Sequence, residues 1–91
     1  PFKTMELSML VLTLSKKIMK IGNKNSISDA GVASEMSFAA IKGAYMNVLI
    51  NLKDIYDDSY RDKVLNKANK ILKRSDSDIR ISREYLSKKI K

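Results

Sequence analysis

Few kinds of side chain in this sequence can take part in acid–base or nucleophilic chemistry. The 91 residues include no cysteine and no histidine. Disulfides, thiol nucleophiles, cysteine-based zinc sites and Ser-His-Asp triads are therefore excluded. Any proton transfer must use Asp, Glu, Lys or Tyr side chains. The candidates with the most informative spacing are one aspartate in a polar segment and two asparagines one helical turn apart.

The aspartate is Asp29, which follows a polar stretch containing Asn23, Asn25, Ser26 and Ser28. Residues 26–29 fit a capping box with Asp29 at N3 in place of the usual Glu or Gln, and this role alone would account for the acid. The stretch nevertheless holds more polar groups than a cap requires, at the helix end that favours anions. Asp29 is thus either a cap or part of a site for an anion or a polar ligand.

The two asparagines, Asn47 and Asn51, lie in an otherwise apolar stretch where asparagine is a poor helix former. They could bond to each other, to a neighbouring helix or to water. Alternatively, they line a ligand cleft, where carboxamides match a heterocycle with alternating donors and acceptors. On a continuous helix they share a face with Asp29, but Asp29 and Asn47 would be roughly 27 Å apart along the axis.

Three helical segments are expected to position these residues, near 4–21, 27–54 and 59–74, followed by a basic tail. The first carries two apolar stripes, so it should pack against more than one neighbour. One stripe comprises Leu7, Val11, Leu14, Ile18 and Ile21, and the other Met5, Met9, Leu12 and Met19. The second segment carries few charges and many small residues, which predicts a long buried central helix.

The sequence therefore predicts an all-α fold, a small bundle of three to four helices in which residues 1–91 form a single domain. Serines and aspartates at 75–78 leave open whether the last two segments are separate helices or one. No segment approaches the roughly 20 apolar residues that span a bilayer, so we expect a cytoplasmic protein without membrane contact.

Positive charge is concentrated in the C-terminal third of the chain. Residues 1–59 carry seven lysines and six acids, whereas residues 60–91 carry eleven Lys/Arg and four acids. Such a run is either a solvated helix face or a surface for a polyanion. Because no clear helix-turn-helix signature accompanies it, the sequence alone does not favour nucleic acid as a partner.

Two sequence motifs resemble those of the cyclodeaminase and cyclohydrolase family of folate metabolism. Residues 22–33 are similar to the family's G-N-x-N-S-x-S-D-x-G-V-A stretch, and residues 43–52 to its G-A-Y-x-N-V-x-I-N-L stretch. Residues 1–6 resemble the proline-led start of the helix that precedes them. The order and spacing agree over residues 1–56, and the rest matches only as a basic helical tail. By resemblance the chain corresponds to the C-terminal half of a formiminotetrahydrofolate cyclodeaminase or methenyltetrahydrofolate cyclohydrolase domain.

The resemblance implies a reaction at the one-carbon unit that bridges two folate nitrogens, by addition of water or loss of ammonia. Both reactions pass through a cation-bearing carbon, which a carboxylate stabilises. Asp29 is the implied catalytic carboxylate, and a tetrahydrofolate derivative is the implied substrate, with no metal and no further cofactor. The implied substrate-binding residues are Asn25, Ser26, Ser28, Asn47 and Asn51. Because the family's N-terminal half has no counterpart in the sequence, we expect a fragment or a truncated relative, and whether the isolated chain is an enzyme stays open.

The family is dimeric, and the apolar faces predicted above favour a homodimer here as well. In an antiparallel two-fold pairing, Asp29 of one chain would approach Asn47 or Asn51 of the other. Two alternative functions remain: a basic helical module that binds nucleic acid, and a structural dimerisation module without a ligand.

Overall fold

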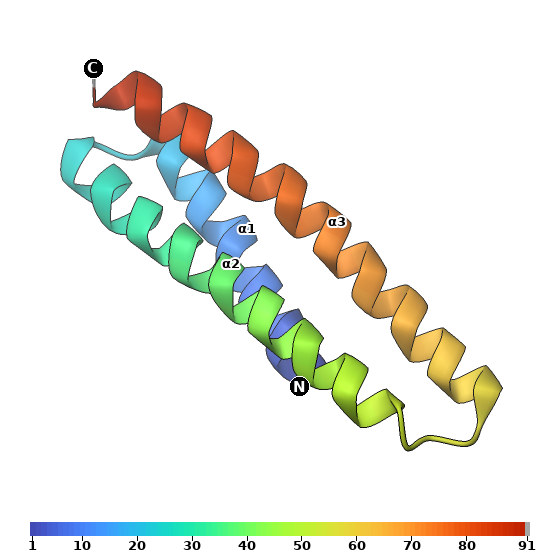
Figure 1. Cartoon of the computed structure of the whole chain (residues 1–91). Coiled ribbons are helices and arrows are strands. Elements are labelled where there is room, and N and C mark those ends of the chain that lie inside the picture. Colours follow the sequence, from blue (N-terminus) through green and yellow to red (C-terminus); the bar gives the residue numbers. More distant parts are fainter. Residues whose placement is uncertain (91) are drawn as a thin grey trace.

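Three long helices account for almost all of the chain, in a computed structural model that describes residues 1–90. Helix α1 spans Phe2–Ile21, α2 spans Lys24–Leu52 and α3 spans Asp58–Lys89. They run side by side, α2 antiparallel to α1 and α3 antiparallel to α2 (Figure 1). The bundle measures 51 × 16 × 15 Å along its principal axes. The predicted all-α bundle is confirmed, and within residues 1–90 no helix could span a membrane.

The first connection shows where α2 begins. The side-chain oxygen of Asn23 accepts hydrogen bonds from the Ser26 amide at 3.0 Å and from the Ser26 hydroxyl at 3.1 Å. Asn23 is therefore the N-cap of α2 and Ser26 is its N3 residue. The predicted capping box at residues 26–29 is wrong, because the helix begins one turn earlier. Asp29 lies in the second turn of α2 and does not cap it.

The second connection is short and acidic, and α3 follows it without interruption. Asp57 caps α3 by accepting a hydrogen bond from the Tyr60 amide at 3.1 Å. The helix then continues through residues 75–78, where the sequence left a break open. Ser75 and Asp78 do not stop the helix because both face the interior: the Ser75 hydroxyl donates to the Leu72 carbonyl oxygen, and Asp78 is buried.

The core lies along the line where the three helices meet. In α2 the buried positions recur every three or four residues, the spacing that keeps one face on neighbouring helices. These positions are Ile27, Ala30, Ser34, Ser37, Ile41, Ala44, Val48 and Leu52, and Gly31 beside Ala30 is buried as well. In α1 the methionine stripe is inside: Met5, Leu12 and Met19 are fully buried. The burial of the long second helix is thus confined to one face.

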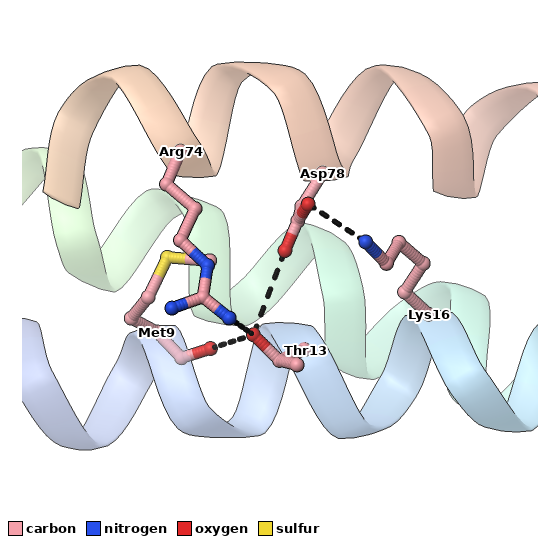
Figure 2. A network of polar contacts seen from close by, with 5 residues as sticks. All are labelled: Met9, Thr13, Lys16, Arg74 and Asp78. Carbon is pink, nitrogen blue, oxygen red and sulfur yellow. Dashed lines mark hydrogen bonds and ion pairs between the residues drawn. The ribbon is translucent and has the colours of Figure 1, made fainter. Parts of the chain in front are cut away.

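A polar network joins α1 to α3 at mid-length (Figure 2). Lys16 Nζ donates to Asp78 Oδ1 at 2.9 Å, and the Thr13 hydroxyl lies 3.5 Å from Asp78 Oδ2 and 3.0 Å from the Met9 carbonyl oxygen. Arg74 Nη2 donates to Thr13 Oγ1 at 3.4 Å. Because a hydroxyl has one proton, Thr13 can donate to only one of its two acceptors at a time. The network fixes the parallel register of α1 and α3.

Candidate functional site

The structure brings two of the predicted site residues, Asp29 and Ser26, to the same hollow. This hollow, of about 400 Å³, lies between α1 and the start of α2. Its remaining walls are Ser15, Ile18, Ala30 and Ala33. Asp29 is exposed and is the only charged residue in the lining. The site is therefore a largely apolar groove with a single carboxylate at its edge.

Within residues 1–90 no side chain or backbone group forms a hydrogen bond or an ion pair with the Asp29 carboxylate. The hydrogen bonds at the start of α2 go to Asn23, and the ion pairs of the bundle engage Asp58, Asp76, Asp78 and Glu35. A carboxylate that neither caps a helix nor pairs with a cation has no structural role inside the subunit. Its hydrogen-bonding capacity remains free for a ligand or for another chain.

The other predicted residues near Asp29 differ in accessibility. Asn25 and Ser28 are exposed, whereas Ser26 is half-buried and uses its hydroxyl to bond Asn23. Ser26 therefore shapes the wall of the hollow and supports the cap. Asn25 and Ser28 face solvent and do not belong to the lining of this hollow.

Asn47 and Asn51 lie at the opposite end of α2 from Asp29. Both are exposed, so neither amide needs a partner inside the bundle. Asn51 borders a separate small hollow of about 170 Å³, whose lining also includes Phe2, Leu52 and Ile55. A single subunit thus separates the two groups of predicted residues, as the helical spacing indicated.

An exposed apolar surface connects the two ends. On α1 it comprises the stripe that the bundle leaves outside, with Leu7 57%, Val11 45%, Leu14 49% and Ile18 45% exposed. Ile18 shares the hollow with Asp29 and Ala33, and residues three or four apart continue along the same helix face. On α2 this face carries Asp29, Met36, Ala40, Gly43 and Asn47. We call the α1 stripe and this α2 face together the α1–α2 face. The α2 residues that pair with α3, Glu35 and Lys42, lie on another side of the helix.

Sequence reasoning did not place Ile18 or Ser15 in the site. The available signal was the second apolar stripe of the first helix, which one chain of this size cannot bury together with the methionine stripe. Met36 is 69% exposed, and apart from the adjoining residues and the backbone of the same helix, no atom lies within 4 Å of the position that a Gly43 Cβ would take. The α1–α2 face is therefore open as well as apolar.

These features agree with a family assignment. The family model for formiminotransferase-cyclodeaminase matches residues 1–70, which include all six predicted site residues. The chain belongs to this family. No solved structure matches it significantly.

Several members of the formiminotransferase-cyclodeaminase family are similar in sequence. The formimidoyltransferase-cyclodeaminase of Rattus norvegicus is 33% identical over 72 residues, which are 79% of this chain and 13% of the relative. That of Dictyostelium discoideum is 33% identical over 87 residues, 96% of this chain and 16% of the relative. The methenyltetrahydrofolate cyclohydrolase of Methylorubrum extorquens is 34% identical over 62 residues, 68% of this chain and 30% of the relative. The chain spans less than a third of the length of each of these relatives.

Proposed function

We propose that this chain contributes a folate-binding surface to a cyclodeaminase or cyclohydrolase reaction, with Asp29 as the catalytic carboxylate. The observation that carries the proposal is the free Asp29 carboxylate at the edge of an apolar hollow. A hollow of this kind suits a flat heterocycle, which needs apolar walls and a few oriented polar groups.

Asp29 would act on the cationic carbon of the one-carbon bridge. In the hydrolytic direction, water adds to this carbon, one carbon–nitrogen bond opens and a formyl group is left. A carboxylate beside the carbon stabilises the positive charge or accepts the proton of the attacking water. Ile18 and Ala33 form apolar walls beside the carboxylate. A ligand seated against them would displace water, and charges attract more strongly where water is excluded.

We further propose that two copies pair through the α1–α2 face. Exposed apolar patches of this kind mark interaction surfaces. A two-fold axis crossing α2 at the level of Phe38 would set Met36 against the partner's Ala40 and Ala33 against the partner's Gly43. A large side chain then meets a small one, and helices can approach closely. The same axis places Asp29 beside the partner's Asn47, so that the ligand site is completed between subunits.

The direct test is titration of the protein with methenyltetrahydrofolate, comparing the natural chain with Asp29→Asn. Asparagine keeps the size and the second-turn position, so the melting temperature should stay within a few degrees. Affinity or turnover should fall at least tenfold. An Asp29→Asn protein that binds and converts the ligand like the natural chain would rule out the proposed role. With the natural chain, formation of the formyl product would indicate the hydrolase. Release of ammonia from a formimino substrate would indicate the deaminase.

A further inference from the structure

The continuity of α3 brings five cations into one exposed group. Residues 63–74 form three uninterrupted turns that contain no acid. Their cations are exposed, and we call them the basic stripe: Lys63, Lys67, Lys70, Lys73 and Arg74. Four of them, at 63, 67, 70 and 74, recur at intervals of four, three and four residues and so share one side of the helix. The group extends over roughly 16 Å of helix axis.

The first two acids after the stripe on α3 are neutralised by cations from the other helices. Asp76 pairs with Lys42 of α2 at 3.2 Å, and Asp78 pairs with Lys16 of α1 at 2.9 Å. Within residues 1–90 no cation of the stripe has an ion pair. Glu6 of α1 shares a hollow with Arg74 without reaching ion-pair distance. The packing of the bundle therefore leaves the charge of the stripe uncompensated.

Amide groups lie among the lysines. A surface hollow of about 530 Å³ on α3 is lined by Asn66, Asn69, Lys70 and Lys73, together with Leu72 and Asp76. Asn69 Oδ1 accepts a hydrogen bond from the Tyr45 hydroxyl at 2.8 Å, which orients its NH₂ group away from that contact. Lysine and asparagine side chains are common donors to phosphate oxygens.

We propose that the basic stripe binds the phosphate backbone of nucleic acid without reading base sequence. A row of cations on a straight helix matches the linear charge of a nucleic-acid strand, and each neutralised phosphate releases bound counterions. A membrane is disfavoured, because interfacial helices insert an apolar face, whereas within residues 58–90 the exposed large hydrophobic residues are only Tyr60 and the C-cap Ile90. The stripe lies on α3, so this binding is independent of the α1–α2 face and of folate.

The test is fluorescence anisotropy with a labelled mixed-sequence DNA duplex at salt concentrations between about 50 and 200 mM. Lys63→Gln, Lys67→Gln and Lys70→Gln are combined in one variant. The matched control combines Lys3→Gln, Lys17→Gln and Lys20→Gln, which removes the same charge from exposed lysines of α1. Arg74 is left intact because it contacts Thr13.

We expect the natural chain to bind with a log–log salt slope of about −4, from four to five phosphate contacts at about 0.9 each. The stripe variant should lose at least tenfold in affinity and about 2 to 3 from the magnitude of the slope, while the control keeps most of both. Equal losses in the two variants would overturn the proposal, since net charge alone would then explain the binding. Absence of duplex binding would also overturn it. So would equally tight, stripe-dependent binding to phosphatidylserine vesicles, which would assign the stripe to a membrane.

Discussion

Lys16 Nζ lies 2.9 Å from Asp78 Oδ1, and this ion pair joins α1 to α3 in the interior of the bundle (Figure 2). The Asp78 side chain is 7% exposed, and that of Lys16 is 27% exposed. A second pair, between Lys42 and Asp76, joins α2 to α3 at 3.2 Å, with side chains 43% and 50% exposed. The two pairs have similar chemistry and different burial, so they separate the effect of burial from that of charge.

Asp78→Ala should lower the free energy of unfolding by roughly 2–3 kcal/mol, just below the usual cost of breaking a buried ion pair, since Lys16 retains some access to water. Asp76→Ala should cost less than about 1 kcal/mol, because exposed pairs contribute little. Urea unfolding of both variants measures the difference. Equal losses in the two variants would show that burial of Asp78 is unimportant.

Stability should also depend on pH through Glu35. A bidentate hydrogen bond from Arg83 lowers the pKa of Glu35 below its ordinary value of 4.5. A carboxyl whose folded pKa is depressed stabilises the fold above its unfolded pKa, and this contribution is lost as the pH falls below about 4.5 toward the folded pKa.

Glu35→Gln should therefore destabilise the protein at pH 7 by less than about 1 kcal/mol, because the pair is half-exposed. In strong acid the variant and the natural chain should unfold alike. The measurement is thermal unfolding at a series of pH values. A stability difference that persists unchanged in acid would show that the effect is not electrostatic.

The start of α2 gives a test of the cap. Asn23→Ala removes the acceptor for the Ser26 amide and should cost about 1 kcal/mol. Ser26→Ala removes only the hydroxyl bond to Asn23 and should cost less. If Ser26→Ala were the more damaging change in urea unfolding, Ser26 would be the cap that the sequence pattern indicated.

These cases show what the sequence could and could not predict. Periodicity located the three helices, because apolar spacing determines which segments can bury a face. The sequence pattern placed the cap at Ser26, whereas Asn23 caps the helix, since both residue types cap well. The sequence left open whether the helix continues through residues 75–78, since serine and aspartate favour helix ends on average. In the structure the helix continues, and Lys16 forms an ion pair with the buried Asp78.

The candidate site was predictable in its residues and less so in its environment. The two motifs at residues 22–33 and 43–52 identified Asp29 and the asparagines. Asp29 borders an open groove only if the stripe of α1 that contains Ile18 faces outward. Both stripes are apolar, so the sequence did not decide which of them faces inward. Only the packing shows that the methionine stripe is buried while Ile18 stays beside Asp29.

Pairing through the α1–α2 face predicts a strong effect of charge at Ala40. Ala40→Arg places a cation at the proposed two-fold contact and should convert a dimer to a monomer in light scattering at micromolar concentration. Ser77→Arg, which adds the same side chain to an exposed position of α3, should leave the mass unchanged. A natural chain that is already monomeric at this concentration would contradict the proposed pairing.

The central claim, a folate site shared between subunits, is tested most directly by mixing two inactive variants. Asp29→Asn and Asn47→Leu proteins each lack one half of every site. In an equal mixture about half of the dimers are heterodimers, and each heterodimer holds one intact site, because the natural Asp29 and Asn47 meet across the two-fold axis. Calorimetric titration with methenyltetrahydrofolate should then recover about a quarter of the natural number of sites at natural affinity. A mixture that binds no more ligand than the separate variants, although heterodimers form, would show that the site is not built between subunits.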